Sequence, residues 1–259
     1  MDISKAKEII VEFIRERTEE AGAKGAVIGI SGGIDSALTA YLSVEALGKE
    51  NVLGIHMPEL NITPAEDVLD ATEVAQRLGI EFKTIDVSGP FESFLKAMPD
   101  SEESIYHANG NLKARIRMSM LYYYANMMNR VVMGTGNKTE ILLGYFTKYG
   151  DGGVDLEPIG DIYKTEVRKM SQLMGIPDEI IDKAPSARLW ADQTDEEELG
   201  ITYPQVDRFL ALLLEGESPQ VAQNTLGLTA EQRDSVISRI NSNLHKQKTA
   251  PIPEMSSLR

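Results

Sequence analysis

The sequence contains no cysteine and no long hydrophobic run. Without cysteine there is no disulfide framework, no thiolate-bound metal and no cysteine nucleophile, so any acyl or sulfur chemistry must use other groups. No stretch approaches the roughly 18 apolar residues of a membrane-spanning helix, and the first residues carry no signal-peptide pattern. We therefore expect a soluble, cytoplasmic protein that has no membrane partner.

Basic residues are scarce relative to acidic ones. The 259 residues include 26 Lys and Arg against 40 Asp and Glu, a formal net charge of −14. Proteins that coat nucleic acid neutralise phosphates with surface Lys and Arg, so this balance argues against a nucleic-acid partner, while local basic patches remain open. The length suits one large domain, and no repeat divides the chain. We expect a single domain over residues 1–259, with a helical C-terminal part from about residue 160.

Short β-branched runs alternate with helical periodicities along the first half of the chain. The sequence predicts strands over 26–30, 52–57, 81–87 and 130–134. It predicts helices over 3–20, 37–46, 64–78 and 109–128, and further helices near 163–174, 203–214 and within 218–243. The stretch between 88 and 108 is expected to be irregular. This alternation is typical of a Rossmann-like α/β fold, a parallel sheet with helices on both faces, whose ligands bind beyond the carboxyl ends of the strands.

A glycine-rich loop follows the first predicted strand and precedes a helix. It reads Gly29-Ile30-Ser31-Gly32-Gly33-Ile34-Asp35-Ser36. Backbone N–H groups at such a junction bind anions, and glycines let phosphate oxygens approach the main chain. The loop lacks the lysine of a Walker A motif and the spaced glycines of a dinucleotide fingerprint. The alternative is an ordinary glycine-rich turn with a capping serine.

The loop resembles the Ser-Gly-Gly-x-Asp-Ser loop of the N-type ATP pyrophosphatases, which have the adenine nucleotide alpha hydrolase-like fold. The resemblance implies that the Ser31 and Ser36 hydroxyls and the loop amides hold the leaving pyrophosphate of ATP, while Asp35 binds Mg²⁺. Stabilisation of the leaving group is what attack on the α-phosphate requires.

Four further segments resemble NAD synthetases, and the resemblance runs from about residue 20 to the end. The segments are 110–118, 134–140, 144–155 and 197–201, with His245-Lys246 near the C-terminus. The string from Phe146 to Gly153 is highly specific to that family. Its members activate the nicotinate carboxylate of deamido-NAD with ATP, release pyrophosphate, and let ammonia displace AMP from the acyl-adenylate.

The resemblance implies a set of ligand contacts. Those to ATP would come from Gly29, Ile30, Ser31, Gly32, Gly33, Ile34, Asp35, Ser36, Thr135, Lys164 and Ser186. Mg²⁺ would be bound by Asp35 and Glu140. Deamido-NAD would be contacted by Lys148, Asp155, His245, Lys246 and one or both of Arg115 and Arg117. In the adenine pocket, His56 stands where a larger basic residue is common in relatives.

The predicted helix over 109–128 separates the two arginines. It has an apolar stripe made of Leu112, Ile116, Met120, Tyr123 and Met127. Arg115 and Arg117 lie about 100° to either side of this stripe, so both cannot reach one phosphate unaided. We expect one to bind substrate and the other to serve a partner subunit or a surface pair. The resemblance implies a homodimer, since the family closes its deamido-NAD site across two subunits; the tyrosines at 122–124 suit such an interface or core packing equally.

The missing cysteine also bears on the source of nitrogen. Larger members of the family carry a glutaminase with a cysteine nucleophile, so this chain is expected to use ammonia directly. The proton of ammonium would pass to Asp151 or Asp155, between which the sequence does not choose. The glycine-rich loop over 144–154 is interpreted as a lid, and the acidic run at 195–198 as a solvated helix start.

Despite the negative net charge, basic groups are expected to gather in one cleft. They are Lys113, Arg115, Arg117, Lys148, Lys164, His245 and Lys246. Two rival functions remain. One is a different ligase or amidotransferase with the same pyrophosphatase loop, and the other is a non-catalytic nucleotide-binding sensor.

Overall fold

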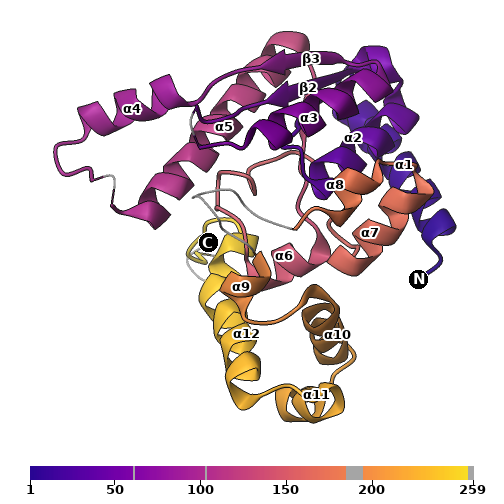
Figure 1. The fold of residues 1–259 in the computed structure, drawn as a ribbon, viewed down its shortest axis with the longest axis vertical. Coiled ribbons are helices and arrows are strands. Elements are labelled where there is room, and N and C mark those ends of the chain that lie inside the picture. Colours follow the sequence, from indigo (N-terminus) through magenta and orange to yellow (C-terminus); the bar gives the residue numbers. More distant parts are fainter. Residues whose placement is uncertain (61, 103, 185–194, 256–259) are drawn as a thin grey trace.

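The computed structural model describes residues 1–60, 62–102, 104–184 and 195–255 (Figure 1). Within these ranges a parallel sheet has four strands in the order β3-β2-β1-β4. They are β1 (Ala26–Gly29), β2 (Val52–His56), β3 (Glu81–Thr84) and β4 (Val131–Met133). Val27 of β1 is in register with Leu53 on one side and Val132 on the other. The predicted parallel α/β sheet is confirmed.

Helices cover both faces of the sheet (Figure 1). One face packs against α1 (Ile3–Glu20), α2 (Ile34–Leu47), α3 (Ala65–Leu78), α7 (Lys164–Leu173) and α8 (Asp178–Asp182). The other packs against α4 (Ser88–Ala97) and α5 (Tyr106–Met128). Successive side chains of a strand point to opposite faces, so the neighbours Val27 and Ile28 belong to different hydrophobic clusters.

Three helices of the described residues were not predicted from the sequence. The stretch expected to be irregular contains α4, in which Pro90 lies in the first turn and Phe91 is buried against the sheet. Proline is tolerated in a first turn because that N–H has no helical partner, so Pro90 is compatible with the helix. The other two are short helices, α6 (Lys138–Leu143) and α8 (Asp178–Asp182). The third strand was also predicted too long, because it ends at Thr84.

The apolar stripe predicted on α5 is only partly right. Ile116 is buried against the sheet, but Tyr123 is 68% and Met127 61% exposed. Lys113, by contrast, is buried. The C-terminal half of the helix buries Ala125, whose small side chain lets the helix lie close to β1 and β4. The exposed Tyr123 and Met127 leave this side of α5 available to a partner.

The C-terminal helices build a separate hydrophobic cluster together with α6. They are α9 (Asp195–Leu199), α10 (Tyr203–Leu214), α11 (Pro219–Leu226) and α12 (Ala230–Asn243). Val206 and Phe209 of α10 and Leu143 at the end of α6 are fully buried within it. Figure 1 shows α10, α11 and α12 beside one another, away from the sheet. A short 3-10 turn over Leu244–Gln247 then leads toward the C-terminus.

No helix among the described residues is both long and apolar enough to cross a membrane.

Candidate active site

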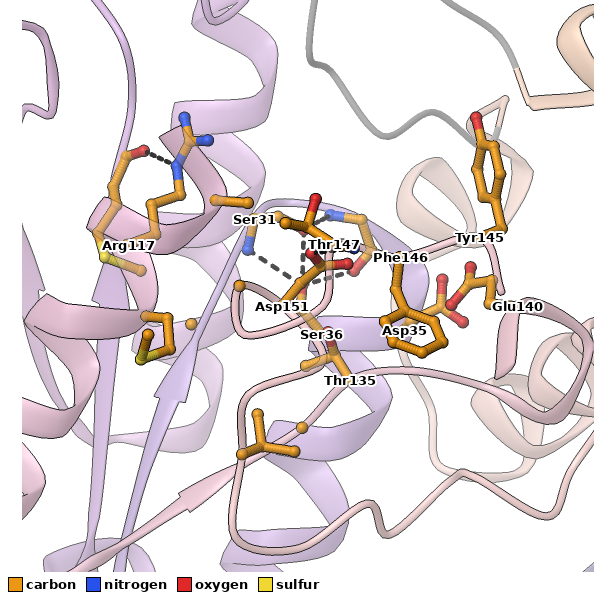
Figure 2. Close-up of a pocket in the computed structure, with 18 of the residues that line it drawn as sticks. Ser31, Asp35, Ser36, Arg117, Thr135, Glu140, Tyr145, Phe146, Thr147 and Asp151 are labelled. Carbon is orange, nitrogen blue, oxygen red and sulfur yellow. Dashed lines mark hydrogen bonds between the residues drawn. The ribbon is translucent and has the colours of Figure 1, made fainter. Parts of the chain in front are cut away.

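A pocket of about 540 Å³ lies at the carboxyl ends of the strands, the edge where ligands bind in such sheets (Figure 2). Its wall is made by the glycine-rich loop after β1, the end of β2, one side of α5, the loop after β4, and residues of the segments 144–154 and 239–246. The size is in the range of small-molecule sites. The sequence therefore brings segments more than 200 residues apart to one cavity.

The glycine-rich loop is shaped by two serines and one obligatory glycine. The Ser31 and Ser36 hydroxyls lie 3.0 Å apart, and the Ser36 hydroxyl also accepts the Ser31 N–H at 3.1 Å. Gly32 has a φ of +88°, and a Cβ at this position would lie 2.4 Å from the Asp67 carbonyl oxygen. The loop ends at the N-terminus of α2, where N–H groups and the helix dipole favour an anion. This geometry fits the predicted phosphate loop.

Asp35, Glu140 and Lys164 form a charged cluster in the pocket. The Lys164 ammonium is ion-paired with Asp35 and lies 3.5 Å from a Glu140 oxygen. Burial raises the pKa of the Glu140 carboxyl to about 8, with the Asp35 carboxylate adding to the effect. Burial alone would lower the pKa of Lys164, but the two carboxylates outweigh it and raise that pKa. The cluster therefore holds a cation between two carboxylates.

The same donor set suits Mg²⁺. Mg²⁺ prefers oxygen ligands and is commonly bound by one or two carboxylates, with phosphates and water completing its shell. Asp35 and Glu140 converge on one point, as their shared contact with Lys164 requires. No group of three or more Asp, Glu, His or Cys residues able to hold a metal occurs in the described part of the chain. These two residues thus fit a metal that arrives with ATP rather than one in a closed protein site.

Asn137 connects the two carboxylates and was not predicted from the sequence. Its side-chain amide donates to Asp35 at 3.0 Å, and its side-chain oxygen accepts the Glu140 N–H at 3.1 Å. The Glu140 carboxylate in turn accepts the Asn137 N–H at 3.2 Å, which completes a capping box at the start of α6. The spacing Asn-x-x-Glu is the signal that would have identified both the cap and the helix.

The loop over 144–154 folds around Thr147. The Gly150 N–H donates to the Thr147 carbonyl at 2.9 Å, and the Thr147 N–H donates to the Asp151 carboxylate at 2.9 Å. Asp151 projects into the pocket (Figure 2), and desolvation by the surrounding protein raises its pKa. At Gly152 a Cβ would lie 2.4 Å from the Phe146 ring, so this position requires glycine.

The residues predicted for deamido-NAD divide into two groups. Arg117 and Lys246 line the pocket, where Arg117 donates to the Met57 carbonyl at 3.0 Å and Lys246 to the Gly144 carbonyl at 2.8 Å. The others do not line it within the described part of the chain; they are Arg115, Lys148, Asp155 and His245.

Residues of this second group contact one another or the core. Arg115 donates to the Lys148 carbonyl at 3.3 Å, and the Lys148 ammonium donates to the His245 carbonyl at 2.6 Å. Asp155 accepts the Tyr122 hydroxyl at 2.9 Å and the Val132 N–H at 2.8 Å. The two arginines of α5 thus point to different places, as their spacing predicted.

Lys113 does not join the basic cluster. It forms a buried ion pair with Glu59 at 2.7 Å, so its expected place in the substrate cleft is wrong. Asp195 is likewise not a solvated residue: it is 3% exposed and accepts the Tyr203 hydroxyl at 2.9 Å. Both errors have one cause, because a sequence pattern does not show which charged residue finds a buried partner. Ser186 lies outside the described residues.

His56 lies at the end of β2 on the pocket wall. Its Nδ1 lies 2.8 Å from the Ile30 carbonyl oxygen, so Nδ1–H donates, and Nε2 has no partner in the residues that the structure describes. Burial lowers the pKa of this imidazole, which favours its neutral form. Thr135, after β4, also lines the pocket. Both residues thus lie on the wall of the pocket, and the ATP contact of Thr135 stays a prediction.

The fold and pocket define a nucleotide-binding α/β protein with a pyrophosphatase-type loop. The family model described as NAD synthase matches residues 6–250. The chain is 60% identical over 259 residues to the NH(3)-dependent NAD(+) synthetase of Methanococcoides burtonii, with 100% of this chain and 98% of that protein covered. It is 45% identical over 258 residues to the protein of the same name from Archaeoglobus fulgidus, with both chains fully covered.

Two solved structures are similar throughout. The NMN synthetase from Francisella tularensis has a TM-score of 0.87 and 34% identity, with 98% of this chain and 100% of that chain covered. The NH3-dependent NAD synthetase from Campylobacter jejuni has a TM-score of 0.82 and 33% identity with the same coverage. The chain belongs to the NAD synthase family. It is therefore an enzyme, a ligase of NAD biosynthesis, and the resemblance described from its motifs is confirmed.

Proposed function

We propose that the protein converts deamido-NAD, ATP and ammonia to NAD, AMP and pyrophosphate through an acyl-adenylate. The observation that carries the proposal is one pocket that contains the paired Ser31 and Ser36 hydroxyls, the Asp35–Lys164 ion pair and the Asp151 carboxylate. These are an anion site, a cation site and a proton acceptor. The reaction needs all three within reach of one another.

ATP occupies the end of the pocket next to α2. The Ser31 and Ser36 hydroxyls and the loop N–H groups hold the pyrophosphate, and Lys164 compensates the charge that develops on it. Thr135, and Ser186 by resemblance, complete the nucleotide contacts. Mg²⁺ held by Asp35 and Glu140 would supply further charge compensation to the phosphates. A nicotinate carboxylate oxygen then attacks the α-phosphate, and pyrophosphate leaves.

Ammonia supplies the nitrogen. Ammonium must lose a proton before it attacks the acyl carbon, and Asp151 is favoured over Asp155 as the acceptor. Asp151 faces the pocket with a raised pKa, whereas both oxygens of Asp155 already accept hydrogen bonds from the protein. The attack forms the C–N bond and breaks the bond between the acyl carbon and AMP. Asp155 then acts as a support for the loop over 144–154.

We infer that the deamido-NAD site is completed in a homodimer. Arg117 and Lys246 line the pocket, while Arg115, Lys148 and His245 lie outside it. The exposed Tyr123 and Met127 of α5 supply apolar area for a second copy. In such a dimer, Arg115, Lys148 and His245 of one subunit would contact the deamido-NAD bound by the other. A cytoplasmic location agrees with the supply of these nucleotides.

The experiment incubates purified protein with ATP, Mg²⁺, deamido-NAD and ammonium, and measures NAD, AMP and pyrophosphate. We expect the three products in equal amounts. Glutamine in place of ammonium tests the nitrogen source, and nicotinate mononucleotide in place of deamido-NAD tests the dinucleotide specificity. Absence of NAD with ammonium contradicts the proposal. Faster turnover of the mononucleotide would reassign the acyl substrate while leaving the ligase chemistry in place.

A further inference from the structure

A buried carboxylate outside the pocket contacts the beginnings of two helices that carry pocket residues. Asp207, on α10, is 5% exposed. One of its oxygens accepts the hydroxyl of Thr139 on α6, and the other accepts the Thr165 N–H on α7 at 2.9 Å. The Thr139 hydroxyl oxygen also accepts the Lys164 N–H at 3.1 Å. One side chain of the C-terminal part thus links α6 and α7.

Each linked position adjoins a charged residue of the pocket. Thr139 directly precedes Glu140, and Lys164 is the first residue of α7. The first N–H groups of a helix have no partner within it, and negative charge near them is stabilising. Asp207 and Thr139 satisfy two of these groups on α7. The contacts therefore fix where α7 starts relative to α6, which sets the distance between the Lys164 and Glu140 side chains.

Tyr203, one turn before Asp207 on α10, contacts Lys164 of the charged cluster. The ring centroid of Tyr203 lies 5.3 Å from the Lys164 ammonium, a cation–π distance. Tyr203 and Asp207 are four residues apart, so they share one side of α10. The helix is held rigidly because Val206 and Phe209 are fully buried. α10 thus presents a supporting face to the charged cluster, and Asp207 is its polar contact with the backbone.

We propose that Asp207 is a positioning residue for the ATP site, acting through the Thr139 hydroxyl and the N-terminus of α7. It holds Glu140 and Lys164 in the places from which both reach the region of Asp35. The inference rests on the proposed roles of those three residues in the reaction. It adds that the C-terminal helices control the geometry of nucleotide binding, although Asp207 touches no substrate.

The test removes the link without removing a pocket residue. Thr139→Val keeps the side-chain shape but loses the hydroxyl, Thr139→Ser restores the hydroxyl, and Asp207→Asn keeps the size but loses one acceptor. The matched control is Thr18→Val on α1, where a buried hydroxyl donates to the Ile14 carbonyl at 2.7 Å away from the pocket. Melting temperatures establish that each variant is folded and show how much stability each has lost.

Two further readouts separate positioning from stability. They are kcat for NAD synthesis, and the affinity for ATP measured by calorimetry in EDTA, where no metal contributes. We expect Thr139→Val and Asp207→Asn to lower kcat and weaken ATP binding by about tenfold or more, since misplaced groups cost that much. Thr139→Ser should retain about a third or more of the wild-type kcat, and Thr18→Val should stay within about twofold of both values.

The double variant gives an internal check. If Thr139 and Asp207 act through one link, adding Thr139→Val to Asp207→Asn changes kcat by less than about twofold. If Thr139→Val and Asp207→Asn lower only the melting temperature, as Thr18→Val does, Asp207 is a structural residue and the proposal is wrong. A wild-type protein that makes no NAD would overturn the proposed function instead, and the ATP-affinity comparison would still decide the role of Asp207.

Discussion

The side-chain amide of Asn137 donates a hydrogen bond to the Asp35 carboxylate at 3.0 Å, while the other end of the same amide caps the helix that carries Glu140. Asn137 is completely buried. One neutral side chain therefore links the Asp35 carboxylate to the start of the helix that carries Glu140. The two ends of the amide have different functions: the NH₂ group binds Asp35 in the charged cluster, whereas the oxygen caps α6.

Asn137→Asp separates these functions. Asp caps a helix as well as Asn, so the cap is retained, but the donor is replaced by a third carboxylate beside Asp35. We expect kcat to fall by at least about tenfold, because the added charge draws Lys164 or Mg²⁺ from its place. Asn137→Ala, which loses the cap, should cost about 1 kcal/mol of unfolding free energy. Steady-state kinetics and urea denaturation measure the two effects; an active Asn137→Asp protein would contradict this role.

Gly32→Ala should abolish ATP binding. The added Cβ would meet the backbone oxygen of Asp67 at 2.4 Å in a left-handed conformation, so the phosphate loop must move. The control is Gly22→Ala, which also has a positive φ, of +62°, but open space around the Cβ. We expect the control to lose about 1 kcal/mol of unfolding free energy, and Gly32→Ala to lose more. Calorimetric titration with ATP measures the binding. If both variants bind ATP like the wild type, the prediction for Gly32→Ala is wrong.

Lys164→Met should destabilise the fold as well as abolish turnover. It leaves Asp35 and Glu140 facing each other without their shared cation, and breaking a buried pair costs about 3–5 kcal/mol. Lys138→Met is the control, since Lys138 also begins a helix and pairs with Asp161, whose side chain is 96% exposed. Lys138→Met should lower the unfolding free energy by at most about 1 kcal/mol. Equal losses in urea denaturation would show that the Lys164 pairs are not specially stabilising.

Glu157 should make stability depend on pH. Burial, aided by the charge of Asp151, raises the pKa of its carboxyl to about 8, although the Gly136 N–H acts to lower it. A raised native pKa means that the native state binds more protons than the unfolded chain. The stabilising contribution is complete below the ordinary value of 4.5 and is lost as the pH rises through about 8.

Glu157→Gln removes this titration with little change in shape. We expect the stability of the variant relative to the wild type to increase between about pH 5 and pH 9, because only the wild type must lose a buried proton. Urea denaturation across this range measures the difference. A difference that does not change with pH would show that Glu157 is ionised in the native protein at neutral pH.

The sheet, and the loop for which phosphate binding is proposed, could be located from local patterns. β-branched runs at fixed intervals led to the parallel sheet, and the string from Gly29 to Ser36 led to the anion site because its chemistry depends on backbone geometry within eight residues. The capped helix α6 was missed because it is short, although Asn137 and Glu140 have the spacing of a capping box. A helix of this length shows too little hydrophobic periodicity to be recognised, and the capping box was overlooked.

The rest depends on contacts between distant segments, which local periodicity does not encode. Lys113 and Lys164 were both predicted to lie in the cleft, and nothing in their sequence neighbourhoods separates them. In the structure Lys113 pairs with Glu59, whereas Lys164 pairs with Asp35. Asp207 stands among apolar residues of α10 and gave no sign that its partners lie on α6 and α7. Which charged residue is buried, and against what, is decided by tertiary packing.

The most direct test of the proposed chemistry follows the oxygen atoms of the nicotinate carboxylate. Deamido-NAD labelled with oxygen-18 in that carboxylate is incubated with the protein, ATP, Mg²⁺ and ammonium, and the AMP is analysed by mass spectrometry. An acyl-adenylate transfers one carboxylate oxygen to the α-phosphate, so the account predicts one labelled oxygen in each AMP formed together with NAD. Unlabelled AMP, or formation of ADP and phosphate instead of AMP and pyrophosphate, would contradict it.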